Sequence, residues 1–138
     1  MRKGIKIDFP ENNAPAYIDF SAVALGFEAV TQNAMVNLGT RMGSDHIDEE
    51  RGTTLLEAAT LGSLLDAGEQ EHAAAYAAEQ TRLYLRDQED AENIQDNDER
   101  IAEVGLEVKD MDLKKIVFNA FFVNVNGKQI GQPLTTVL

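Results

Sequence analysis

The 138-residue sequence has no cysteine and no tryptophan, and it contains only three prolines and two histidines. Without cysteine the chain cannot form a disulfide, supply a thiolate to zinc or use a cysteine nucleophile. It also lacks any apolar run near the ~18 residues that a membrane-spanning helix needs, and the opening MRKGIKIDF has no signal-peptide core. We therefore expect one soluble domain with no membrane partner.

Basic residues are scarce as well. Lysine and arginine number 12 against 24 acidic residues, which gives a formal charge of −12. Because nucleic-acid binding needs a basic surface, we expect no nucleic-acid partner. The negative charge is concentrated in residues 66–100, where eleven acids stand against three bases. Such a run indicates either a solvated helix face or a docking face for a basic partner.

The hydrophobic spacing of the first two thirds of the chain predicts helices after a short arm. Residues 4–9 alternate and indicate a strand, which the sequence PENNAP interrupts. Apolar residues recur at helical spacing over 27–38, and Gly39 follows where a helix would end. A shorter helix is expected over 53–65. The alanine-rich segment 69–91 predicts a long helix, with an apolar side made of Ala73, Tyr76, Ala77, Leu83 and Tyr84.

The last third of the chain predicts an antiparallel sheet. Residues 101–108 hold mostly alternate apolar positions, and 115–125 is rich in the branched and aromatic residues that suit strands. The Asn-Gly pair at 126–127 indicates a turn, and 133–138 supplies a last extended piece. The expected fold class is α+β: an N-terminal arm or strand, two to three helices, then a C-terminal antiparallel β-meander with the helices on one side.

No residue pattern predicts catalysis, a cofactor or a metal. His72 lies in the alanine-rich segment, where a partly exposed helical residue is a simpler interpretation than a catalytic base. His46 lies among acids, but their spacing matches neither the zinc helix motif nor the calcium loop. The many acids provide candidate carboxylate pairs everywhere, so none is singled out for glycoside hydrolysis. We expect no enzyme and no catalytic, cofactor or metal residue.

The glycine-rich stretch NLGTRMGSDHIDEERGTTLL, residues 37–56, is better explained as a joint between two helices. Gly39 or Gly43 would give the backbone freedom after the first helix, and Ser44 or Asp45 would cap the next segment. Gly52 would let the chain turn in close against the core. The charges of the joint would then be solvated surface groups.

Two segments together resemble a known family. The run ALGFEAVTQNAMVNLGTRMGSDHIDEERGTTL at 24–55 and the run DERIAEVGLEV at 98–108 are similar to the small baseplate wedge proteins of contractile phage tails. These are the sheath initiators, once labelled tail lysozymes, with relatives in type VI secretion baseplates. The first match consists of residues in the family's order, namely Leu25, Gly26, Thr40, Gly43, Ser44 and Gly52. In the second, Arg100 and Ile101 match, while Asp98 and Glu99 stand where the family has glutamate and proline.

The resemblance implies how the chain is organised and what it contacts. Residues 1–24 would form an N-terminal arm, and 25–138 a single wedge domain similar to the inner domain of a sheath subunit. The triplet Asp98, Glu99 and Arg100 would bind larger wedge proteins, whereas the residues alone indicate a polar turn. The C-terminal sheet would bind sheath strands, whereas the residues alone favour a sheet that closes its own core. The strand positions implied in sheath binding are Val117, Asn119, Phe121, Val123, Val125, Ile130 and Leu134.

The function implied by the resemblance is structural. The protein would join the wedge to the tail and template polymerisation of the first sheath ring by strand sharing, with about six copies around the tail. Its partners would be the tail sheath protein, the larger wedge proteins and, as further candidates, tube or hub proteins. It would lie in the virion, in the tail baseplate, after assembly in the host cytoplasm. The alternatives are a type VI secretion baseplate component and a peptidoglycan-cleaving tail lysozyme.

Overall fold

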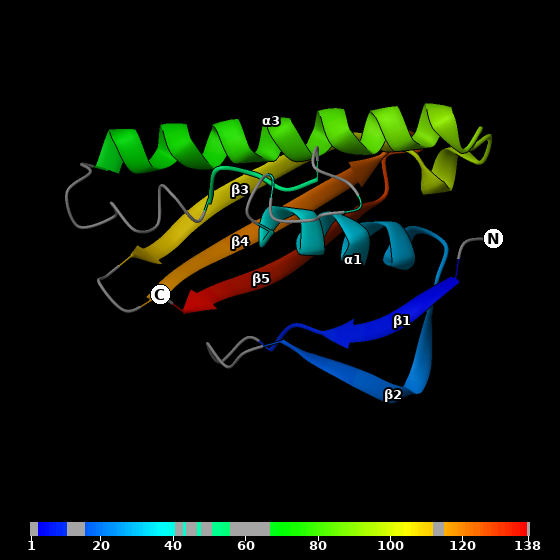
Figure 1. Ribbon diagram of the computed structural model, residues 1–138, viewed down its shortest axis with the longest axis horizontal. Coiled ribbons are helices and arrows are strands. Elements are labelled where there is room, and N and C mark those ends of the chain that lie inside the picture. The colour runs from blue at the N-terminus through cyan, green and yellow to red at the C-terminus, as the bar shows by residue number, and fades with distance from the viewer. Residues whose placement is uncertain are drawn as a thin grey trace.

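The computed structural model describes residues 3–10, 16–40, 43, 47, 51–55, 67–111 and 115–137. This part of the chain forms an α+β structure with two α-helices and two antiparallel sheets. The larger sheet carries the helices on one side, and the smaller sheet is an N-terminal hairpin that lies beyond the first helix (Figure 1). The α+β fold class expected from the sequence is therefore confirmed.

The N-terminal arm is a hairpin rather than a single strand. Strand β1 (Lys3–Asp8) is the strand predicted from the alternating opening residues. It pairs antiparallel with β2 (Tyr17–Leu25), which lies where the sequence indicated no second strand. The register shifts between Ile5 and Lys6, so β2 bulges over residues 20–22 and its alternation is interrupted.

The two helices follow the predicted ranges closely. Helix α1 (Phe27–Leu38) ends before Gly39, whose N–H donates to Met35 O at 3.1 Å. Helix α3 (Ala67–Ala91) contains the whole predicted segment 69–91. Its buried side differs from the predicted one, because Tyr76 and Leu83 are exposed. The buried positions of α3 are Ala74, Ala77, Ala78, Thr81, Tyr84, Leu85 and Glu89.

The predicted short helix at 53–65 lies largely outside the described residues, but the end of the joint before it is well defined. The N–H of Gly52 donates to Asn37 Oδ1 at 2.8 Å, and the hydroxyl of Thr53 donates to Leu38 O at 3.0 Å. Gly52 is buried and has a φ of 110°, a backbone conformation that suits glycine. Asn37, itself fully buried, also donates to the Thr81 hydroxyl, so the joint is tied to both helices.

The C-terminal sheet is the predicted meander. A short 3-10 helix, η2 (Asn97–Glu99), leads into β3 (Ile101–Met111), β4 (Lys115–Asn124) and β5 (Gln129–Val137). The strand order is β3-β4-β5 and both pairings are antiparallel, with Leu106 opposite Ala120 and Phe122 opposite Ile130. The predicted Asn-Gly turn joins β4 to β5, with Gly127 at a φ of 86°.

The hydrophobic core lies between the helices and one face of this sheet. Helix α3 runs along β3, while α1 crosses near β4 and β5 (Figure 1). The alanines of α3 present little bulk, so the helix can lie close to the strand. The buried residues of the core cluster are Phe27, Val30, Ala34, Met35, Leu38, Leu55, Ala74, Ala77, Leu85, Ile101, Phe118, Ala120 and Phe122. The opposite face of the sheet is left without a helix among the described residues.

Candidate functional site

The central strand β4 separates the two faces of the sheet. Phe118, Ala120 and Phe122 point into the core and are at most 1% exposed. Because side chains alternate along a strand, the residues between them point to the other face. That face, here called the open face, carries Val117, Asn119, Phe121 and Val123. These are four of the positions implied in sheath binding, and the structure places them on one face of the sheet. Asn119 is exposed there, Phe121 and Val123 are half-buried, and Val117 is buried at 8% exposure.

Phe121 is fixed on the open face by a glycine. Gly105 on β3 lies directly opposite Phe121, and a Cβ added to Gly105 would lie only 1.9 Å from the ring. The ring therefore lies across the backbone of β3 at a residue that leaves room for it. A glycine covered by an aromatic ring on the neighbouring strand recovers some of the packing that glycine lacks. The pairing gives the open face a positioned aromatic side chain.

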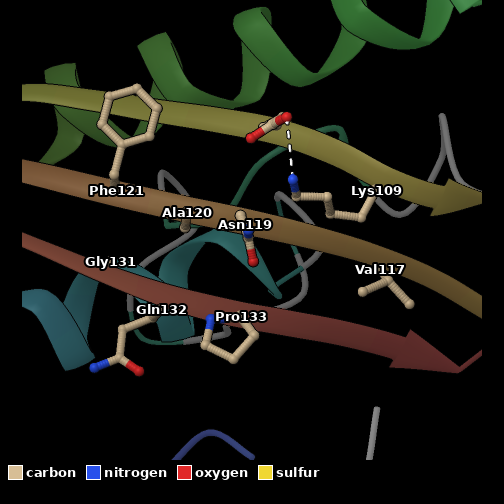
Figure 2. Close-up of a pocket in the computed structure, with 9 residues that line it drawn as sticks. Lys109, Val117, Asn119, Ala120, Phe121, Gly131, Gln132 and Pro133 are labelled. Atoms are coloured by element: carbon tan, nitrogen blue, oxygen red, sulfur yellow. Dashed lines mark hydrogen bonds and ion pairs between the residues drawn. The ribbon is translucent and has the colours of Figure 1, made fainter. Parts of the chain in front are cut away.

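A shallow hollow of about 580 Å³ lies beside Phe121 on the open face. Figure 2 shows its residues on the three strands, with Pro133 of β5 next to Asn119 of β4. Glu107 is the acidic residue that lines the hollow, and its carboxylate accepts a hydrogen bond from Lys109 Nζ at 3.2 Å. The residues that line the hollow are Glu107, Lys109, Val117, Asn119, Ala120, Phe121, Gly131, Gln132 and Pro133. An apolar floor with amides and one ion pair at its edge suits a protein surface better than a small charged ligand.

The other positions implied in sheath binding lie elsewhere. Val125 belongs to the turn after β4 and is 49% exposed. Ile130 is opposite Phe122 and packs partly buried against the core. Leu134 is opposite Phe118, the core-facing residue of β4. The seven positions therefore do not form one contact surface, because the alternation that puts Phe121 on the open face assigns Ile130 to the core.

Strand addition needs unpaired backbone groups, and β4 has none to offer because it pairs on both sides. The edges of the sheet are β3 and β5. Helix α3 lies along β3 (Figure 1). Among the described residues, β5 has no further strand beside it. The free side of β5 is therefore the position at which an extended segment could add to this sheet.

Pro133 interrupts that free side. The Asn124 N–H donates to Lys128 O at 3.0 Å, so these two residues form a hydrogen-bonded pair of the antiparallel ladder. Hydrogen-bonded pairs alternate with non-hydrogen-bonded pairs along such a ladder, so every second pair of β4 and β5 beyond Asn124 and Lys128 is hydrogen-bonded. The residues of β5 between those pairs turn their backbone groups outward: Gly131, Pro133 and Thr135. Proline has no N–H, so it fits an outward position without loss to the ladder. It also removes one donor from the edge and so limits uncontrolled pairing.

The triplet Asp98, Glu99 and Arg100 forms the turn between α3 and β3. Asp98 is exposed and its Oδ1 accepts from Asn126 Nδ2 at 2.8 Å. Glu99 is 5% exposed. The two carboxylates thus have different environments: one remains at the surface and one is inside the fold.

Arg100 is held mainly by the end of α3. Its Nη1 donates to Ile94 O at 3.0 Å and its Nη2 to Asp90 Oδ1 at 3.3 Å. Its Nε lies 3.9 Å from Glu89 Oε2, and Glu89 is buried at 3% exposure. The Glu89 Oε1 accepts from the Ile101 N–H at 2.7 Å, so this carboxylate fixes the start of β3. The guanidinium is 31% exposed and holds the turn between α3 and β3 in place.

The same part of the chain also bears on metal binding and on membrane insertion. Within the described residues, no group of three or more histidine, aspartate or glutamate side chains could hold a metal ion. His46 lies outside the described residues, and His72 is exposed on α3. No helix among the described residues is long and apolar enough to cross a membrane. The acids of α3 at 71, 79, 87 and 90 are exposed, as a solvated helix face requires.

Comparison of the chain with models of protein families gives no match, and comparison with curated proteins gives none either. Function is therefore inferred from the open face, the β5 edge and the sequence resemblance to baseplate wedge proteins.

Proposed function

We propose that this protein is a structural component of a contractile phage tail baseplate that joins the wedge to the tail and templates the first ring of sheath. The observation that supports this most is a three-stranded antiparallel sheet covered by helices on one face and, among the described residues, open on the other. Such a sheet presents side chains and a strand edge at once, which strand sharing requires. The similarity to the inner domain of a sheath subunit is part of this proposal.

The proposed contact with sheath has two parts. An extended sheath segment adds along the free side of β5, where Gly131 and Thr135 offer outward N–H groups on either side of Pro133. Side chains of the sheath subunit then cover the hollow beside Phe121. Backbone pairing supplies general affinity, while the hollow and the missing donor at Pro133 select the register.

The proposed contact with the larger wedge proteins uses the turn at Asp98, Glu99 and Arg100. Asp98 is exposed, so it can accept from a partner's basic or amide group. Arg100 contributes mainly by holding the turn against α3, because its guanidinium already has partners within the chain. Removing Arg100 should therefore lower the stability of the protein as well as weaken wedge binding.

The proposed assembly needs no catalytic step and no cofactor. The partners are the tail sheath protein and the larger wedge proteins, with tube or hub proteins as further candidates. The protein would act in the virion baseplate after assembly in the host cytoplasm. About six copies around the tail would follow from the symmetry of such a baseplate.

The experiment is co-purification of the sheath subunit from the same genome with this protein and with two variants. Phe121→Ser removes the aromatic from the open face without touching the core, and Leu83→Ser removes an exposed apolar residue of similar size from α3. Deleting β4 and β5 would be a poor test, because β4 supplies Phe118 and Phe122 to the core and Ile130 of β5 packs against it. We expect sheath to be retained by the wild type and by Leu83→Ser, and lost with Phe121→Ser. Equal retention by all three would refute a contact at the open face.

A further inference from the structure

The turn between β4 and β5 contains Asn126 followed by Gly127, the one asparagine-glycine pair in the sequence. Such a pair is prone to spontaneous deamidation, because glycine has no side chain to hinder the approach of its backbone nitrogen to the asparagine side chain. Both residues are exposed, so water reaches them. The structure around the turn therefore decides whether the reaction proceeds.

Deamidation begins with ring closure between the two residues. The backbone nitrogen of Gly127 attacks Cγ of Asn126, so that a new C–N bond forms and the bond from Cγ to Nδ2 breaks. Nδ2 leaves as ammonia and takes the amide proton of Gly127 with it. Water then opens the cyclic imide and leaves aspartate or isoaspartate at position 126. Ring closure requires a Gly127 nitrogen and an Asn126 side chain that can turn toward each other.

The turn holds the attacking nitrogen in place. The Gly127 N–H donates to Asn124 O at 2.9 Å, which closes a four-residue turn. The Lys128 N–H donates to Asn124 Oδ1 at 2.8 Å, and Asn124 is only 1% exposed. The Gly127 N–H is thus already used inside the turn, and its hydrogen bond must break before the ring can close.

A contact with the preceding turn holds the Asn126 side chain. Asn126 Nδ2, the nitrogen that leaves in the reaction, donates to Asp98 Oδ1 at 2.8 Å. Asn124 Nδ2 donates to the same oxygen at 3.4 Å, and the Asp98 N–H donates to Asp96 Oδ1 at 2.9 Å. These contacts fix Asp98, and a hydrogen bond to a carboxylate is stronger than one between neutral groups. The side chain of Asn126 is therefore restrained from rotating toward Gly127.

We propose that Asn126 is a deamidation site that the contact with Asp98 keeps unreacted in the folded protein. When the Asp98 carboxylate is withdrawn, the Asn126 side chain can turn toward the Gly127 nitrogen and the ring closes. The product carries a carboxylate in place of the amide that Asp98 holds, and two like charges at this separation repel each other. Deamidation therefore also breaks the contact between η2 and the β4–β5 turn. This inference is independent of the proposed function, because it concerns chemistry within the chain.

The test is mass-spectrometric peptide mapping of the full chain during incubation in mildly alkaline buffer, which measures the rate of deamidation at Asn126. Asp98→Ala removes the acceptor, whereas Asp98→Asn keeps an oxygen acceptor without the charge. Asp87→Ala is the matched control, because it removes an exposed acid from α3. The full chain unfolded in urea gives the rate without the turn. Circular dichroism establishes that each variant is folded.

We expect slow deamidation in the wild type and in Asp87→Ala. Asp98→Ala should react faster by about fivefold or more, because one hydrogen bond to a carboxylate no longer has to break. The rate of Asp98→Asn should lie between those of the wild type and Asp98→Ala. The unfolded chain should react at least as fast as Asp98→Ala.

An Asp98→Ala variant that deamidates at the rate of the wild type would overturn the inference. A folded wild type that reacts as fast as the unfolded chain would overturn it too, because the fold would then give no protection. If Asp98→Ala does not fold, Asp98→Asn decides, and a rate equal to that of the wild type counts against the inference.

Discussion

Replacing Arg100 by alanine tests whether this residue serves the fold or is reserved for a partner. The substitution removes one charge-assisted hydrogen bond to Ile94 O and an exposed ion pair with Asp90. It also removes the cation beside Glu89, whose carboxylate is 3% exposed. The first contact is worth about 1.5–3 kcal/mol when shielded, and the exposed pair less than about 1 kcal/mol. Because the guanidinium is 31% exposed, solvent weakens these contacts. The free energy of unfolding should therefore fall by about 2 kcal/mol.

The free energy of unfolding of Arg100→Ala is measured by urea denaturation and compared with Arg86→Ala. Arg86 is an exposed arginine on the same helix, and removing it should change stability by less than about 0.5 kcal/mol. A loss of about 2 kcal/mol corresponds to a fall in Tm of about 5 to 9 °C for a domain of this size. The free energy of unfolding of Arg100→Lys should lie between those of Arg100→Ala and Arg86→Ala, because lysine keeps the charge but lacks the planar guanidinium.

The result that would refute this reasoning is an Arg100→Ala variant as stable as the wild type. The contacts to Ile94, Asp90 and Glu89 would then contribute no net stability. In that case the guanidinium would be free to leave α3 for a partner, and the triplet would act as the resemblance implies.

Three other positions offer independent tests. Phe122→Ala, at a fully buried residue, should lower the free energy of unfolding by about 3–5 kcal/mol in denaturation experiments, and a loss below about 1 kcal/mol would contradict the core assignment. Pro133→Ala restores a donor to the free side of β5, so light scattering of concentrated protein should rise, and unchanged scattering would show that the edge is covered. The Ser21 hydroxyl and N–H hold the pKa of Asp19 below its ordinary value of 3.8, so Ser21→Ala should raise that pKa in an NMR titration. Since a lowered pKa in the folded state adds stability above the unfolded pKa and loses it in more acidic solution, the wild type should lose more stability than Ser21→Ala as the pH falls below about 4.

The sequence was sufficient for the elements whose periodicity is simple. Helix α1 and the long helix α3 show helical spacing or strong helix formers, and β4 is rich in the branched and aromatic residues that suit strands. Because side chains alternate along any strand, Val117, Asn119, Phe121 and Val123 are then expected on one face, as the structure has them. Strand β2 escaped prediction because the bulge at 20–22 interrupts its alternation.

Other features depend on register or on distant partners, which local patterns do not contain. The cover of Gly105 by Phe121 exists only because β3 and β4 pair with these two residues opposite each other. The position of Ile130 in the core depends on the turn between β4 and β5, which fixes the register of β5. The contact of Arg100 with Glu89 requires α3 to end beside the start of β3.

The buried side of α3 is also a feature that the local sequence pattern did not predict. Sequence spacing alone placed Tyr76 and Leu83 on that side, and this was wrong because both are exposed. The core instead selected small side chains such as Ala74 and Ala78, which lie close to those positions along the helix. A thin apolar side made largely of alanine does not specify which alanines will face the sheet, so tertiary packing decides it.

The measurement that tests the central claim most directly is amide hydrogen exchange of this protein, free and bound to the sheath subunit from the same genome. Strand addition along β5 should protect the outward N–H groups of Gly131 and Thr135, which should exchange readily in the free protein because no described strand lies beside them. The amides of Ile130 and Gln132 point toward β4 and serve as internal controls. Protection of the outward amides on binding is the predicted result. Binding of sheath with unchanged exchange at Gly131 and Thr135 would contradict the proposed strand addition.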